Sequence, residues 1–143
     1  MTNSIRHVGI VVNDLEKCLD FWLKTLEFEV AIDQYEPSPY INELLGFDVK
    51  RLRTVKLRDP KGFLVELLKF EDLEVEKDWK GTLKTTGLTH LALTVLDLES
   101  ICQNLKNNGF EFVSEIKLSP DKKVNVVFVK GPENLFLELV QQI

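Results

Sequence analysis

The chain has 143 residues, of which 44% are hydrophobic and 29% charged, and its formal net charge is −5 at pH 7. This length suffices for one compact domain or for two small modules that share a core. The negative charge argues against a nucleic-acid-binding surface, which would be basic. No apolar run approaches the roughly 20 residues that span a bilayer, and the first residues do not resemble a signal peptide. The sequence therefore predicts a cytoplasmic protein without a membrane or nucleic-acid partner.

The first half of the chain alternates β-rich runs with one amphipathic helix. Asn13 and Asp14 offer an N-cap for a helix whose apolar positions step by three and one residues up to Leu26. Residues 35–46 resemble a loop that carries a short helix ending at Gly46. The strands expected in this half are 5–12, 28–32, 51–58 and 63–69.

The second half repeats this order after a polar stretch. Residues 71–87 are acid-rich and poorly periodic, which predicts a linker with a turn of helix around Trp79. Asp97 then offers an N-cap for a helix that ends at Gly109. The strands expected in this half are 88–95, 111–118, 124–129 and 135–141.

The two halves are copies of one unit. His7 recurs as His90 in the first strand of each half, and Glu66 recurs as Glu138 in the last strand. Each half has the order strand-helix-strand-strand-strand, so the predicted fold class is α+β with two tandem βαβββ modules. The predicted boundaries are 4–70 for the first module, 71–87 for the linker and 88–142 for the second module, within one domain of residues 1–143.

The chain has two cysteines, Cys18 and Cys102, and each falls in the apolar stripe of a predicted helix. This position predicts two buried, reduced thiols. Their spacing supports neither a disulfide nor a thiolate metal site.

Two histidines and two glutamates at equivalent repeat positions suggest a metal site. Glu138 lies within the apolar run 135–140, where an ionised carboxylate without a partner would cost several kcal/mol. Taken singly, a strand histidine is more often a hydrogen-bonded core residue than a metal ligand, and a strand glutamate often belongs to an ion pair. Taken together, His7, Glu66, His90 and Glu138 form a suitable ligand set for one divalent ion: Zn²⁺, Ni²⁺, Co²⁺, Mn²⁺ or Fe²⁺.

Four segments of the sequence resemble the vicinal oxygen chelate superfamily, which includes glyoxalase I, methylmalonyl-CoA epimerase, extradiol dioxygenases and fosfomycin- and bleomycin-resistance proteins. The segments are Ile5–Glu16, Phe21–Leu26, Asp59–Leu67 and Leu88–Ala92. The resemblance implies the glyoxalase/bleomycin resistance/dioxygenase fold, in which paired βαβββ modules form a cupped mixed sheet around the metal. It also implies a homodimer that acts on a small-molecule substrate.

Within that superfamily, the ligand set is most similar to that of glyoxalase I, because Glu66 and Glu138 are both present. This similarity implies a lyase or isomerase whose metal chelates two substrate oxygens while Glu138 or Glu66 transfers a proton. Glutathione is a candidate cosubstrate, although the sequence shows no clear glutathione-binding set. Alternatives are an enzyme like methylmalonyl-CoA epimerase, which has a glutamine in place of Glu66, and a non-catalytic binding or resistance protein. An extradiol dioxygenase ranks lower, because the chain lacks a further histidine for proton transfer.

Substrate contacts are less clearly marked. Arg51 and Arg53 alternate with apolar or small residues and share one face of a predicted strand. They are candidates to bind a substrate carboxylate or phosphate. A solvated basic edge is the plainer interpretation.

Overall fold

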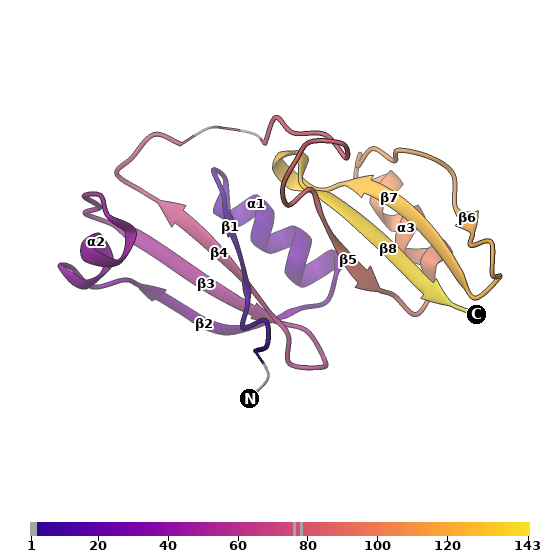
Figure 1. Cartoon of the computed structure of the whole chain (residues 1–143), viewed down its shortest axis with the longest axis horizontal. Coiled ribbons are helices and arrows are strands. Elements are labelled where there is room, and N and C mark those ends of the chain that lie inside the picture. The colour runs from indigo at the N-terminus through magenta and orange to yellow at the C-terminus, as the bar shows by residue number, and fades with distance from the viewer. Residues whose placement is uncertain (1–2, 76, 78) are drawn as a thin grey trace. The chain divides into compact units, whose positions relative to one another are not determined.

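The computed structural model describes residues 3–75, 77 and 79–143, and it contains two compact units, Met1–Lys77 and Asp78–Ile143 (Figure 1). Each unit is built on one four-stranded mixed sheet. The predicted α+β class, with tandem βαβββ modules, is confirmed. Among the described residues, no helix has the length and apolar character needed to cross a bilayer.

The first unit has the strand order β1-β4-β3-β2, in which β1 pairs in parallel with β4 and the other pairs are antiparallel. Its strands are β1 (Val8–Val11), β2 (Glu29–Tyr35), β3 (Leu52–Arg58) and β4 (Leu64–Phe70). Its helices are α1 (Leu15–Asp20), the π-helix η1 (Phe21–Thr25) and α2 (Tyr40–Leu45).

The second unit repeats this topology with the order β5-β8-β7-β6, and β5 pairs in parallel with β8. Its strands are β5 (His90–Thr94), β6 (Lys117–Leu118), β7 (Val124–Lys130) and β8 (Phe136–Gln142). Its helices are α3 (Leu98–Asn107) and the 3₁₀-helix η2 (Pro132–Asn134).

Both units start their helix with the same cap. The Asp14 carboxylate accepts a hydrogen bond from the backbone N–H of Lys17 at 3.1 Å. The Asp97 carboxylate accepts one from the backbone N–H of Ser100 at 3.0 Å. Each aspartate thus satisfies a backbone donor that the first turn of a helix leaves unpaired, as the sequence predicted.

One face of each sheet is packed and the other is more open. Side chains alternate between the faces of a strand, so the fully buried Leu67 and Leu139 point away from the face that carries Glu66 and Glu138. In the second unit α3 contacts β8 and buries an apolar stripe that includes Cys102. Cys18 and Cys102 are both buried, and neither forms a disulfide among the described residues, which confirms that prediction.

The insert between β2 and β3 covers part of the face that carries Glu66. Ile41 of α2 belongs to a buried cluster with Val49, Leu52 and Phe70. Leu52 and Phe70 are direct partners across β3 and β4, and Phe70 is four residues beyond Glu66 on the same face. One end of this face is therefore apolar and closed.

Two expected elements differ in the structure. The single helix predicted up to Leu26 changes after Asp20 into a π-helix, in which the backbone N–H of Leu26 donates to the Phe21 carbonyl at 3.1 Å. The strand predicted over 111–118 is reduced to β6 and one bridge between Phe112 and Val129. Polar residues interrupt it, and the Ser114 hydroxyl donates to the Glu115 carbonyl, a local bond that competes with strand pairing.

The turn of helix predicted around Trp79 is also different. Trp79 lies outside any helix, and residues 76 and 78 fall outside the described residues. The Trp79 ring instead packs edge-on against Phe136, with ring centroids 6.1 Å apart. This ring contact within the second unit takes precedence over the weak local helix preference, although Trp79 remains 37% exposed.

Candidate metal-binding site

The parallel pairing of the first and last strands of each unit brings one histidine and one glutamate together. Glu66 is the register partner of Gly9, and Glu138 is the register partner of Ala92. His90 lies two residues before Ala92 on β5, so its imidazole shares one face of the sheet with Glu138. His7 directly precedes β1, two residues before Gly9, and its ring lies beside Glu66. Each unit therefore places its histidine beside its glutamate in the same way, as the sequence repeat predicted.

The two pairs have similar dimensions. His7 Nε2 lies 3.8 Å from Glu66 Oε1, and His90 Nε2 lies 3.3 Å from Glu138 Oε2. Two donors bound to one tetrahedral ion at the usual Zn–N and Zn–O distances would be about 3.4 Å apart. In each pair, the spacing of the donors and their nitrogen and oxygen chemistry suit two ligands of a divalent ion.

The second histidine has well-defined neighbours. The Thr89 hydroxyl lies 2.8 Å from His90 Nδ1, and the Phe128 ring packs edge-on at 5.0 Å between centroids. If the hydroxyl accepts from Nδ1–H, the Nε2 lone pair is free to bind a metal. In the first unit, His7 Nδ1 is buried without a hydrogen-bond partner among the described residues.

The two pairs differ in a third side chain that sequence reasoning did not identify. Lys56 Nζ lies 3.4 Å from Glu66 Oε2, and Lys56 is the direct partner of Glu66 across β3 and β4. The corresponding partner of Glu138 is Phe128. The sequence contains one hint of this role, because Lys56 lies between two apolar residues of its strand. Only the strand register shows that Lys56 faces Glu66.

The structure brings together His7 with Glu66 and His90 with Glu138. Within residues 3–75, 77 and 79–143, no group of three or more histidine, cysteine, aspartate or glutamate side chains is arranged to hold a metal ion. Each unit by itself thus supplies two of the four predicted ligands.

Arg53 and Arg51 belong to ion pairs. The Arg53 guanidinium donates to both carboxylate oxygens of Asp33, at 2.8 and 2.7 Å, and these hydrogen bonds hold the pKa of Asp33 below its ordinary value. Arg53 also lies on the face of β3 opposite to Lys56 and Glu66. Arg51 pairs with Glu71. These contacts favour a structural role over substrate binding.

The chain belongs to the Glyoxalase/Bleomycin resistance protein/Dioxygenase superfamily, whose profile matches residues 6–128. It is 30% identical to the lactoylglutathione lyase of Schizosaccharomyces pombe over 148 aligned residues, covering 99% of this chain and 48% of that protein. The chain thus spans about half the length of this curated relative.

Solved structures share the fold. A glyoxalase family protein from Bacillus cereus superposes with a TM-score of 0.91 at 17% identity, covering 100% of this chain and 96% of that one. The fosfomycin resistance protein FosX from Listeria monocytogenes, solved with Mn(II) and sulfate, superposes with a TM-score of 0.65 at 14% identity, covering 100% and 95% of the two chains. Members of this superfamily include metal-dependent enzymes.

Proposed function

We propose that the chain is a cytoplasmic, divalent-metal-dependent lyase or isomerase of the glyoxalase I type, active as a homodimer on a small α-oxygenated carbonyl compound. The single observation that carries the proposal is the histidine–glutamate contact that recurs where the first strand of each unit begins, beside the last strand. Similarity to a lactoylglutathione lyase, whose name specifies the lyase reaction and a glutathione thioester, supports this reaction class.

The proposed metal ligands are His7, Glu66, His90 and Glu138. The four supply two imidazole nitrogens and two carboxylates, a set suited to Zn²⁺, Ni²⁺, Co²⁺, Mn²⁺ or Fe²⁺. A bound ion would polarise two neighbouring substrate oxygens and stabilise negative charge that develops on them. Glutathione is the proposed cosubstrate, by similarity to the lyase.

Glu138 is the better placed of the two glutamates to move a proton. Both Glu66 oxygens are engaged, Oε1 by His7 and Oε2 by Lys56. Only Oε2 of Glu138 has an ion-pair partner among the described residues, which leaves Oε1 open on the same face. A carboxylate oxygen in this position can accept a proton from the carbon next to a polarised carbonyl and return it to the neighbouring carbon.

The decisive experiment measures metal content per chain by elemental mass spectrometry on the wild type, His90→Ala and Glu138→Ala. Glu99→Ala, on the exposed side of α3, is the matched control. We expect near-stoichiometric metal in the wild type and control, and loss in both site variants. The identified metal is then used to assay the hemithioacetal of methylglyoxal and glutathione, for which Glu138→Gln should lose at least about 100-fold in kcat.

Wild-type protein that stays metal-free after reconstitution with all five candidate ions would contradict the metalloenzyme proposal. It would favour a small-molecule binding protein of the same fold. Light scattering of the purified chain tests the homodimer separately, since a monomer at assay concentration would exclude it.

A further inference from the structure

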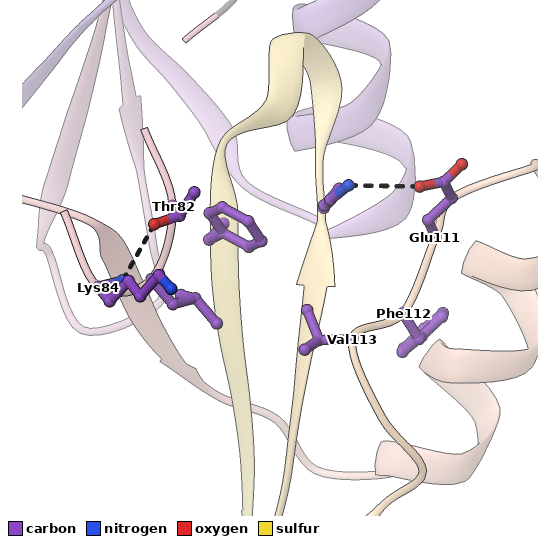
Figure 2. Close-up of a pocket in the computed structure, with 8 residues that line it drawn as sticks. Thr82, Lys84, Glu111, Phe112 and Val113 are labelled. Atoms are coloured by element: carbon purple, nitrogen blue, oxygen red, sulfur yellow. Dashed lines mark hydrogen bonds and ion pairs between the residues drawn. The ribbon is translucent and has the colours of Figure 1, made fainter. Parts of the chain in front are cut away.

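A pocket of about 510 Å³ lies within the second unit, on the sheet that carries His90 and Glu138. Figure 2 shows Thr82 and Lys84 on one side of two adjacent strands and Glu111, Phe112 and Val113 on the other. Leu83, Lys130 and Phe136 complete the lining. Four of the eight lining residues are apolar, and the other four are one threonine, two lysines and one glutamate.

Strand register links this pocket to the candidate metal site. Phe136 is the direct partner of His90 across β8 and β5, and Lys130 is the direct partner of Phe136 across β7 and β8. Partners on neighbouring strands project from the same face, so His90, Phe136 and Lys130 form one row across the sheet. Neighbouring strands are about 4.8 Å apart, which places the Lys130 backbone roughly 10 Å from that of His90.

The pocket has an excess of positive charge in a chain whose net charge is −5. Lys130 Nζ lies 3.5 Å from a Glu111 oxygen, but the Glu111 side chain is 78% exposed, so this ion pair is weak and easily exchanged. Lys84 has no carboxylate partner in the part of the chain that the structure describes. Phe112 bridges Val129, so its ring lies on the α3 face of the sheet, where the Lys106 ammonium is 5.4 Å from the ring centre.

We propose that this pocket binds the apolar body and the terminal anionic group of the substrate. The anionic group, a carboxylate or a phosphate, would contact Lys130 and Lys84, and the apolar body would lie against Phe136 and Val113. This inference rests on the proposed function, since the pocket would bind the end of the substrate that is remote from the two metal-chelated oxygens. It defines the substrate class as an anion whose charged group lies at the Lys130 end of this row of residues and whose reacting carbonyl lies at the His90 end. Methylglyoxal alone carries no charge and is therefore excluded.

The test is an amide chemical-shift titration of the full ¹⁵N-labelled chain in EDTA, so that no metal competes for the anion. The probes are hexanoate, hexyl phosphate and the uncharged 1-hexanol. We expect saturable shifts for both anions at the amides of Leu83, Phe112 and Phe136, and at least about fivefold weaker binding of hexanol, because the ammonium groups attract only the anions. The tighter of the two anions identifies the carboxylate or the phosphate.

Lys84→Met and Lys130→Met, singly and together, should each weaken anion binding severalfold, whereas Lys117→Met on β6 should leave it unchanged. The amide spectrum of each variant reports its fold at the same time. Equal binding of hexanol and the anions would overturn the inference. Chemical-shift changes that are the same in the lysine variants as in the wild type would also overturn it. Absence of pocket shifts with any probe would overturn it as well.

Metal content separates this inference from the proposed function. A chain that binds metal but no hexanoate or hexyl phosphate retains its proposed function and loses the anion pocket. A chain that binds either anion through Lys84 and Lys130 but no metal retains the pocket and loses the proposed metalloenzyme activity.

Discussion

Lys56 and Glu66 face each other across β3 and β4, with 3.4 Å between ammonium and carboxylate. At the same position of the second unit, Phe128 faces Glu138 and packs against His90. The repeat has thus kept its histidine–glutamate pairs and has diverged at the neighbouring side chain. One carboxylate has a cation beside it and the other an aromatic ring, so the two glutamates are not interchangeable.

Replacing Lys56 with methionine should strengthen metal binding. The Lys56 ammonium repels a divalent cation at Glu66, and methionine keeps the length of the side chain without its charge. We expect about a tenfold lower Kd for Zn²⁺ or Mn²⁺, equivalent to about 1.4 kcal/mol, measured by isothermal titration calorimetry. Lys24→Met, which removes a surface lysine paired with Asp20, is the control. Unchanged or weaker affinity in Lys56→Met would show that the ammonium does not oppose the ion.

Replacing Thr89 with valine should weaken metal binding at His90. The Thr89 hydroxyl lies 2.8 Å from His90 Nδ1 and can hold the imidazole in the tautomer that leaves Nε2 free. Loss of such an outer partner typically lowers metal affinity 10- to 100-fold. Competition with a chromophoric chelator measures the Kd for the metal. The control is Thr94→Val, on the same strand as His90. Equal affinities would remove Thr89 from any positioning role.

The ion pair of Arg53 and Asp33 should make stability depend on pH in the acid range. The hydrogen bonds and charge of Arg53 hold the pKa of folded Asp33 below its ordinary value, so the pair contributes stability above that value. The contribution is lost as the pH falls through the lowered pKa of the folded state. Because both side chains are partly exposed, Asp33→Asn should cost only about 0.5–1 kcal/mol at pH 7.

Urea unfolding from pH 7 down to pH 2 measures this difference, which should shrink below about pH 4. Asp20→Asn, at a highly exposed surface pair, serves as the control and should show little difference at any pH. A gap between wild type and Asp33→Asn that stays constant down to pH 2 would rule out the ion pair as its source.

Truncation of Leu105 to alanine should strongly destabilise the second unit. Leu105 lies on α3, is 0% exposed and contributes to the packed face of its helix. Removal of such a side chain leaves a cavity and costs about 2–5 kcal/mol in the free energy of unfolding. Leu118→Ala on β6, where the side chain is 51% exposed, should change it by less than about 1 kcal/mol. Thermal and urea unfolding followed by circular dichroism compare the two, and similar losses would contradict the assignment of the core.

The repeat made much of the fold predictable from the sequence. Helix caps at Asp14 and Asp97 and the order of strands follow from local patterns, because cap chemistry and side-chain alternation act over a few residues. The change to a π-helix after Asp20 was not predictable, since the apolar spacing suits either helix. The loss of strand over 111–116 was also missed, because it depends on competition between local polar bonds and sheet pairing.

For the candidate site, sequence equivalence was enough to pair His7 with Glu66 and His90 with Glu138. It was not enough to find Lys56 or the pocket lined by Lys130, which depend on the register of β3 with β4 and β7 with β8. Strand register brings together residues that are far apart in the sequence, and it cannot be read from the local amino-acid pattern. The position of Arg53 on the opposite face is a further consequence of the same alternation.

Each histidine–glutamate pair joins the first strand of its unit to the last, the two segments that are farthest apart along that part of the chain. An ion held by His7 and Glu66 would therefore act as a clasp across the whole unit, since β1 cannot separate from β4 until the ion is released. Amide hydrogen exchange along those two strands would then slow together when the ion binds. Turnover of the metal in the cell would be tied to how often the unit opens.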